Sequence, residues 1–285
     1  MTVKFPTKCE SFSKSGESQY HRYYNIHYTY VLGLLKSADC KIEYVQATYF
    51  DNYSKTCFEI QVDGKLVAVD FSDHTQLSVP VDKIKKYAAI FKFHYLPNLH
   101  ARYKNIYPFS PVNFQNWKTY SSVVDRIDYR ANGLVICKQR PGGAAVERRN
   151  LVLDLLSKTY GDQFDRKIEN ESNFYMKINE ALVSLRVPGA RNNMLDRGQG
   201  QYMALGCCTI SPRLVTILSH NRELVPGVHY VECAPDYSDL TKKIEWVREN
   251  PELAIQIGKN AKELFNESSL PHKQIEWINK CLNNG

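Results

Sequence analysis

The sequence lacks the apolar run of about 18 to 20 residues that a membrane-spanning helix needs. It has no G-x-G-x-x-G fingerprint, no zinc-finger spacing of cysteine and histidine, and no run of lysine or arginine. The formal net charge of +7 is spread along the chain, and the first sixteen residues contain no signal-peptide core. These absences argue against a membrane-spanning, zinc-binding or nucleic-acid-binding protein, while the mild positive charge suits an anionic ligand.

The composition is that of a globular protein, with 43% hydrophobic and 24% charged residues among 285. The eight cysteines have no metal-ligand rhythm. Several fall in apolar runs, as Cys137 does in GLVICK, where a free thiol packs like a small core residue. We therefore expect reduced cysteines and a cytoplasmic protein, as a monomer or a weak homodimer.

A β-hairpin is predicted in the first half of the chain. The dipeptide Asp63-Gly64 is a turn signal between β-forming segments in FEIQVDGKLVAVDF. Asp70, Asp73 and His74 follow at the end of the second strand. A carboxylate or imidazole at that place is a candidate general base. The alternative interpretation is a polar cap where a strand turns into a loop.

The second half reads as strand, polar loop and helix, twice over. The first unit is a strand at 133–138, a loop with Arg140 and Gly142, and a helix that ends before Gly161. The second is a strand at 181–187, a loop, and a helix that Asp196 caps. A further strand at 207–210 completes a βαβ unit, so a ligand site is expected beyond the carboxyl ends of the strands.

The loop of the second unit is rich in groups that bind phosphate. Five arginines and a single acid, Asp196, occur between positions 186 and 222: Arg186, Arg191, Arg197, Arg213 and Arg222. Free backbone N–H groups and the helix dipole attract an anion to a helix N-terminus, and arginine adds forked donors. The alternative is a solvated basic loop.

The last part of the chain predicts helices. Two amphipathic segments from 239 onward are broken at Asn250-Pro251, and a further helix closes the chain. We interpret Trp246 and Trp277 as packing anchors for these helices rather than as ligand platforms.

The segments QYMALGCCTISP and ELVPGVHYVECAPDYSDLTKKIEWVRENPELAIQIGKNAKELF resemble the donor-binding domain of GT-B glycosyltransferases. In that superfamily a helix ending in Ala-x-Gly precedes a strand, and a Gly-x-His-Tyr segment, an Asp-Leu helix start and a tail rich in Asn-Ala-Lys follow. The capsule-associated group, with protein O-glucosyl- and O-xylosyltransferases and related enzymes of large algal viruses, is the most similar. The resemblance covers about residues 181–264. In the first half of the chain, only the segments DGK and VDFSD resemble the acceptor side of that superfamily.

The resemblance implies an α/β fold of the GT-B type, with two Rossmann-like domains facing a cleft. Residues 1–110 would form the acceptor side and residues 111–270 the nucleotide-sugar side, with a closing helix at 271–285. It implies an inverting enzyme that transfers a sugar from a UDP-sugar, UDP-xylose or UDP-glucose, to a hydroxyl of a glycan or glycoprotein.

The resemblance also assigns site residues. Asp73 matches the acceptor-side catalytic carboxylate, and Gln201 stands where many members have a glutamate that holds the ribose. The loops that meet the diphosphate contribute the remaining donor-binding residues: Arg140, Gly142, Arg191, Asn192, Arg197 and Gly198. No metal or cofactor is expected, because cationic groups and helix N-termini neutralise the leaving diphosphate. The alternative function is a non-catalytic nucleotide- or polyanion-binding protein.

Overall fold

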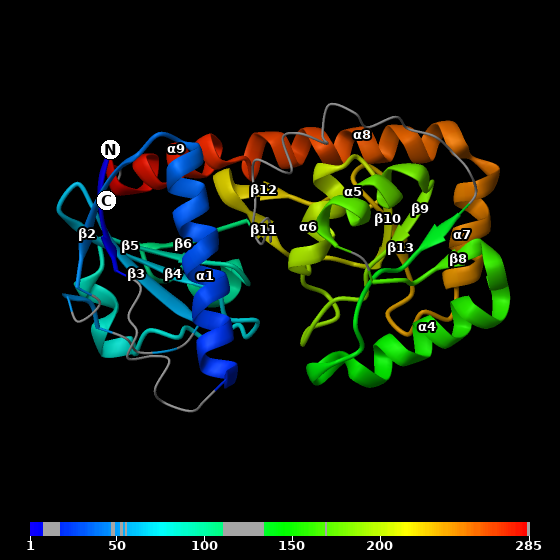
Figure 1. The fold of residues 1–285 in the computed structure, drawn as a ribbon, viewed down its shortest axis with the longest axis horizontal. Helices are drawn as coiled ribbons and strands as arrows, with labels where there is room; N and C mark the ends of the chain where they lie inside the picture. The colour runs from blue at the N-terminus through cyan, green and yellow to red at the C-terminus, as the bar shows by residue number, and fades with distance from the viewer. Residues whose placement is uncertain are drawn as a thin grey trace.

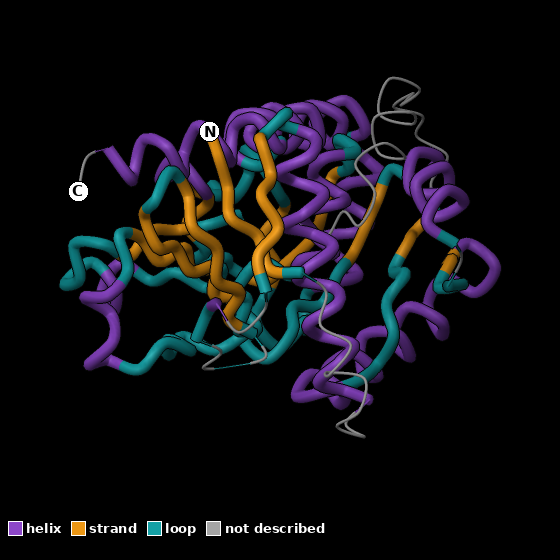
Figure 2. Tube along the Cα trace, turned by 60° about the vertical axis from the view of Figure 1, so that its left-hand side comes forward, coloured by secondary structure: helices purple, strands orange, loops and turns teal. Residues whose placement is uncertain are grey.

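The computed structural model describes residues 1–7, 18–46, 49–51, 54, 56–110, 134–168 and 170–283. Two β-sheets lie side by side along the molecule, one in the first half (residues 1–110) and one in the second (residues 134–283) (Figure 1). Seen from another side, the strands form two separate groups with helices packed beside them (Figure 2). The start of the predicted nucleotide-sugar side, residues 111–133, lies outside the described residues.

The sheet of the first half is mixed. Among the described residues it has six strands in the order β2-β1-β3-β4-β5-β6; β1–β2 and β4–β5–β6 are parallel, whereas β1–β3 and β3–β4 are antiparallel. The resemblance implied a Rossmann-like first domain, but the β3–β4 hairpin makes this sheet only partly parallel. The strands are β1 Thr2–Pro6, β2 Lys41–Val45, β3 Cys57–Val62, β4 Lys65–Asp70, β5 Ala89–Lys92 and β6 Ile106–Pro108.

The predicted hairpin is confirmed. Asp63 and Gly64 join β3 to β4 with positive φ angles of 45° and 83°, as a two-residue hairpin turn requires. The helical elements of this half are α1 Ser18–Ser37, η3 Val81–Lys86 and α2 Pro97–His100. Helix α1 buries Val31, Leu34 and Leu35 in the same hydrophobic cluster as the first strands.

The sheet of the second half is parallel throughout. Its order among the described residues is β13-β10-β9-β7-β8. Helices α4 and α7 pack on one face, while α5 and α6 belong to the cluster on the other. The elements are β7 Val135–Ile136, η4 Gly143–Ala145, α4 Val146–Tyr160, η5 Gly161–Gln163, β8 Phe164–Asp165, α5 Glu171–Glu180, β9 Val183–Leu185, α6 Arg197–Ala204, β10 Cys208–Pro212, β13 Val231–Cys233 and α7 Leu240–Glu249.

This strand order places a switch point between β7 and β9. The chain passes from β7 to β8 on one side, then returns past β7 to β9 and continues to β10 and β13 on the other. Helices that leave two neighbouring strands in opposite directions open a crevice at the carboxyl ends of those strands. The second half is therefore Rossmann-like in its topology.

Three helix ends lie where the sequence predicted them, and each has a capping or helix-breaking residue. Asp196 caps α6, since its carboxylate accepts a hydrogen bond from the Gly198 amide at 2.8 Å. Gly161, with φ of 51°, follows the end of α4. Pro251 opens α8 (Pro251–Ser268) directly after α7 ends.

The C-terminal helices join the two halves. Helix α8 runs along the second half, and α9 (Pro271–Asn283) returns to lie against α1 (Figure 1). Trp277 donates through Nε1 to the Pro108 carbonyl at 2.9 Å, so it is the packing anchor that the sequence predicted. One hydrophobic cluster contains Phe91 of the first sheet, Phe265 of α8 and Trp277. The boundaries at 110 and 270 stay a prediction.

The described cysteines are free, and all except Cys40 are buried. Burial raises the thiol pKa of Cys137, Cys207 and Cys208 to about 12, so these groups are protonated core residues.

A short β-hairpin packs between the two halves, where Ser219 and Ser110 are hydrogen-bonded to each other. It consists of β11 Ile217–Leu218, η6 Ser219–Asn221 and β12 Arg222–Glu223. In the described part of the chain, no helix has the length and apolar character to cross a membrane.

A buried carboxyl contacts Tyr87, the residue that follows η3. Glu59 on β3 is 5% exposed, and its Oε1 accepts a hydrogen bond from the Tyr87 hydroxyl. Its other oxygen, Oε2, has no hydrogen-bond partner among the described residues. Burial raises the pKa of Glu59 to about 7, although the Tyr87 hydrogen bond acts to lower it. The folded state thus favours the protonated acid.

Glu59→Gln is expected to raise the free energy of unfolding at pH 8 by about 1–3 kcal/mol, since each pKa unit corresponds to about 1.4 kcal/mol. The folded-state pKa of Glu59 exceeds its unfolded value near 4.5. Below pH 4.5 the carboxyl therefore does not change the free energy of unfolding, and it lowers that free energy as the pH rises through 7. Urea unfolding at pH 5 and pH 8 measures this effect. The exposed Glu147→Gln is the control, and an unaltered pH dependence in the Glu59 variant contradicts the prediction.

Candidate anion-binding site

The carboxyl ends of β7 and β9 are held together at the switch point. Ile136 and Ser184 are paired in the parallel ladder. Beyond the strands, the Val187 amide donates to Gln139 Oε1 at 3.1 Å, and Arg186 Nη1 donates to the Lys138 carbonyl at 3.2 Å. The loops that follow these strands therefore start from a fixed geometry.

Two guanidinium groups share one carboxylate at this place. Arg186 Nε lies 2.6 Å from Asp196 Oδ1, and Arg149 Nη2 lies 3.3 Å from Asp196 Oδ2. The three side chains are only 14–21% exposed. With two cations and one anion, the group carries an excess positive charge in a partly desolvated setting, which strengthens its attraction for a further anion.

The pKa values follow from this arrangement. Burial acts to raise the pKa of Asp196, but Arg186 and Arg149 outweigh it and the pKa is lowered. For Arg186, burial acts to lower the pKa and Asp196 raises it above the ordinary value. For Arg149, burial prevails over Asp196, and the pKa is lowered. All three groups are charged near neutral pH.

Helix α6 begins against the Arg186 guanidinium. A Cβ on Gly198 would lie 2.1 Å from Arg186 Cζ, so only glycine allows this approach. The next residue, Gln199, is 1% exposed, and its amide Oε1 and Nε2 have no hydrogen-bond partner among the described residues. A buried amide without a partner is costly, and a polar ligand or bound water would satisfy it. We name Arg149, Arg186, Asp196, Gly198 and Gln199 the arginine site.

The predicted residues on the loop after β7 lie beside the arginine site. Arg140 is exposed, and its carbonyl accepts a hydrogen bond from Arg149 Nη1 at 3.3 Å. Gly142 has an extended backbone with φ of 171°, and a Cβ there would meet nothing within 4 Å. The structure therefore gives no reason for glycine at this position.

The predicted residues on the loop after β9 have different surroundings. Arg191 is exposed. Asn192 connects this loop to the one after β13, because its Nδ2 donates to the Pro235 carbonyl at 2.7 Å and its Oδ1 accepts from the Tyr237 hydroxyl at 2.8 Å. The Asn192 side chain thus fixes two loops to each other.

Helix α6 carries the other three predicted donor-binding residues. Arg197 is its first residue, but the Arg197 side chain lies outside the described part of the structure. Gly198 is buried at the Asp196 cap, and Gln201 is half-buried one turn further along. All three are on the first turns of α6, close in sequence to Asp196.

Asp73 lies in the first half, on the loop after β4, and its side chain is exposed. The loop itself is well anchored: His94 Nδ1 is 2.9 Å from the Asp73 carbonyl, and His100 Nε2 is 2.7 Å from the Thr75 carbonyl. Asp70, in contrast, is fully buried. The pairing of Asp73 with the arginine site across a cleft stays a prediction.

Arg186 was among the five arginines expected to attract phosphate, but Arg149, Arg186 and Gln199 were not among the residues that the resemblance assigned to the donor site. Arg149 is in the first turn of α4, whose neighbour Arg148 donates to the Pro188 and Gly189 carbonyls after β9. The available signal was the position of Asp196 as a lone acid among arginines.

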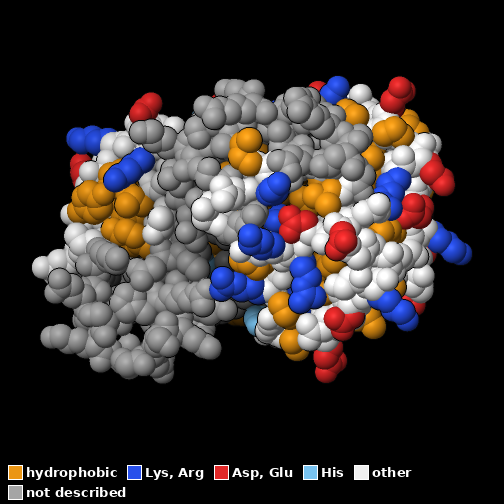
Figure 3. Space-filling view, turned by 45° about the vertical axis from the view of Figure 1, so that its right-hand side comes forward, with side chains coloured by type: hydrophobic (Ala, Val, Ile, Leu, Met, Phe, Trp, Pro, Cys, Tyr) orange, Lys and Arg blue, Asp and Glu red, His pale blue; other side chains and the backbone are white. Residues whose placement is uncertain are grey.

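The space-filling view shows Lys and Arg side chains gathered around a few carboxylates on the described surface (Figure 3).

The sequence matches no protein-family model and no curated protein. Among solved structures, the chain is similar to a glycosyltransferase from Rickettsia africae ESF-5, at 12% identity and a TM-score of 0.48. The similarity covers 95% of this chain and 84% of that one.

Proposed function

We propose that the chain is a glycosyltransferase that takes a sugar from a UDP-sugar. The observation that carries the proposal is the arginine site, which joins two guanidinium groups and a helix start at the switch point of a parallel sheet. Phosphate-bearing ligands bind at such points because backbone N–H groups, the helix dipole and arginine donors converge there. The resemblance of the second half to donor-binding domains supports the same ligand.

In this proposal the arginines act on the leaving diphosphate. Its negative charge grows as the glycosidic bond breaks, and fixed positive groups stabilise that charge. Arg186 and Arg149 are held by Asp196, so they fix the loops and supply a positive field. The outer residues Arg140, Arg191 and Arg197 would contact the phosphates, and Gly142, Asn192 and Gly198 would shape the loops around them.

The same proposal assigns the remaining residues. Gln201 would hydrogen-bond the ribose, since an amide both donates and accepts, and the unpartnered Gln199 amide is a second candidate. Asp73 would take the proton from the acceptor hydroxyl on the face opposite the leaving group, which gives inversion. We propose UDP-xylose or UDP-glucose as donor, a glycan or glycoprotein hydroxyl as acceptor, and no requirement for a metal ion.

Donor hydrolysis over a panel of UDP-sugars, without added metal, tests this function. UDP release from UDP-xylose or UDP-glucose is the expected result. Arg197→Ala is expected to weaken UDP binding by about 1–3 kcal/mol, the usual cost of a lost charge-assisted contact, and calorimetry measures it. Arg102→Ala, on the exposed surface of the first half, is the control. Unchanged UDP affinity in both Arg191→Ala and Arg197→Ala would place the diphosphate elsewhere.

The alternative function is a non-catalytic nucleotide- or polyanion-binding protein. It is favoured by the contrast between the partly buried, hydrogen-bonded arginine site and the exposed side chain of Asp73 in the other half of the chain. Asp73→Ala distinguishes the two functions: an enzyme loses sugar transfer and keeps UDP binding, whereas a binding protein has no turnover to lose.

A further inference from the structure

A hollow of about 590 Å³ lies beside β13, the edge strand of the second sheet. Strand β13 is two places from β9, which puts it about 10 Å away in the sheet. None of the residues that line the hollow belongs to the arginine site. The volume lies within the range of about 300–1,000 Å³ that is typical of small-molecule sites.

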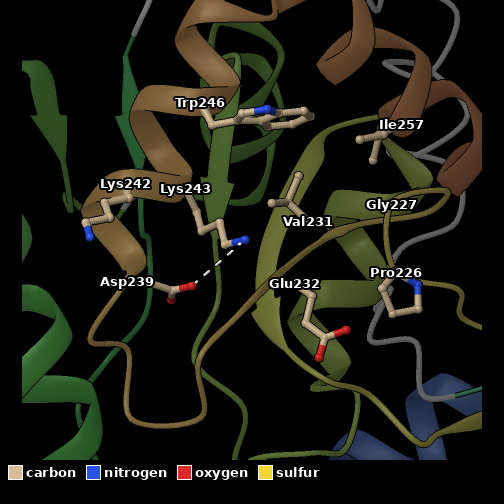
Figure 4. A pocket seen from close by; sticks show the side chains of 9 residues that line it. All are labelled: Pro226, Gly227, Val231, Glu232, Asp239, Lys242, Lys243, Trp246 and Ile257. Atoms are coloured by element: carbon tan, nitrogen blue, oxygen red, sulfur yellow. Dashed lines mark ion pairs between the residues drawn. The ribbon is translucent and has the colours of Figure 1, made fainter.

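The walls of the hollow are apolar. Val231 of β13, Trp246 of α7 and Ile257 of α8 line it together with Pro226 (Figure 4). The Trp246 indole extends over the hollow from α7, above Val231 (Figure 4). Trp246 is 38% exposed, whereas Trp277 is 4% exposed and hydrogen-bonded. The packing role predicted for both tryptophans fits Trp277, but Trp246 leaves much of its surface to solvent.

The rim of the hollow carries charges of both signs in equal number: Glu232, Asp239, Lys242 and Lys243. Lys243 Nζ is 3.9 Å from Asp239 Oδ2, and Glu232 Oε2 is 3.6 Å from Arg213 Nη1. These are long, partly exposed ion pairs, and such pairs contribute little. Lys243 Nζ, Asp239 Oδ2 and Glu232 Oε2 are thus available to a ligand at low cost, whereas Asp239 Oδ1 already accepts from the Ala234 amide at 2.7 Å.

We propose that this hollow binds a neutral saccharide ring. A charged ligand would meet a like charge on the balanced rim, and a wholly apolar ligand would cover polar groups without satisfying them. A sugar ring has a C–H face that packs on an indole, and hydroxyls that both donate to carboxylates and accept from ammonium groups.

The saccharide site depends on residues that the proposed transfer does not use. If the transfer also holds, the hollow would retain a sugar unit of an acceptor chain at a distance from the reacting hydroxyl. Sugar binding here and UDP binding at the arginine site would then be independent.

Saturation-transfer NMR with maltotriose, cellotriose and xylotriose on the full chain tests the proposal. At least one sugar is expected to bind with Kd on the order of 1 mM. Trp246→Ala is expected to weaken that binding at least tenfold, Trp246→Phe to keep most of it, and Lys243→Ala to weaken it severalfold. Leu253→Ala, which removes an exposed side chain of α8 outside the hollow, is the matched control.

Several results would contradict the proposed saccharide site. Absence of binding by all three sugars, or undiminished binding by folded Trp246→Ala, overturns the proposal, with circular dichroism reporting folding. If Trp246→Ala does not fold, full-strength binding by Lys243→Ala overturns it. Competition by UDP would place the sugar at the arginine site and also overturn it. A chain that binds sugar but hydrolyses no UDP-sugar refutes the proposed transfer alone.

Discussion

Asp196→Ala is expected to lower the free energy of unfolding by about 3–5 kcal/mol, the range found when one partner of a buried ion pair is removed. Asp196 is the carboxylate between Arg149 and Arg186, and it also caps α6 through the Gly198 amide. Its loss would leave two partly buried guanidinium groups at a helix N-terminus, where positive charge is unfavourable.

Two further variants separate the charge from the cap. Asp196→Asn keeps a good capping side chain and removes the charge, so most of the loss is expected to remain. Asn170→Ala removes the cap of α5, where the Asn170 side chain accepts from the Asn173 amide at 2.9 Å. This control is expected to cost about 1 kcal/mol. Urea unfolding of the three variants measures the difference; equal losses in Asp196→Asn and Asn170→Ala would mean that the charge contributes little.

Asp196→Ala also tests whether an anion binds at the arginine site. Pyrophosphate bound near Arg149 and Arg186 would replace the missing carboxylate, so it is expected to raise the melting temperature of Asp196→Ala more than that of the unaltered chain. An equal shift in both proteins would mean that the anion does not reach these two arginines.

The elements that the sequence predicted correctly are those with a local cause. The Asp63-Gly64 turn, the Asp196 cap and the Asn250-Pro251 break each depend on the conformation of two or three adjacent residues. The parallel βαβ arrangement of the second half also follows from short-range order, because strand, helix and strand alternate along the chain.

The arginine site could not be assembled in this way. Arg149 and Asp196 are 47 positions apart and meet only because α4 and α6 begin at neighbouring strand ends. A sequence pattern favours loop arginines such as Arg140 and Arg191, which the structure leaves exposed. Similarly, Asp70 is the last residue of β4 and Asp73 lies on the loop after it, and the pairing of β4 with β5 buries Asp70 against Lys92.

Lys92→Met is expected to lower the free energy of unfolding by about 3–5 kcal/mol, because it leaves a buried carboxylate without its cation. Asp70 and Lys92 are paired residues of β4 and β5, both fully buried, with Lys92 Nζ 3.3 Å from Asp70 Oδ1. Burial lowers the pKa of Lys92, and Asp70 acts to raise it again. Lys92 also donates to the Ser72 carbonyl at 2.9 Å.

Asp70 and Lys92 together hold the loop that carries Asp73. Asp70 accepts from the Ser72 amide at 2.9 Å, and from the Ser78 amide and hydroxyl at 2.7 and 2.9 Å. Lys92→Met is therefore expected to speed proteolysis between positions 72 and 78 and, in an active enzyme, to lower turnover with UDP affinity unchanged.

The Asp70→Asn/Lys92→Met double variant removes both charges, so it is expected to recover part of the stability that Lys92→Met loses. Lys86→Met breaks an exposed pair with Asp51 and is the control, with an expected cost below about 1 kcal/mol. If Lys92→Met costs no more than Lys86→Met, the buried pair does not stabilise this end of the sheet. The position of Asp73 would then depend on His94 and His100, whose rings contact the backbone of the same loop.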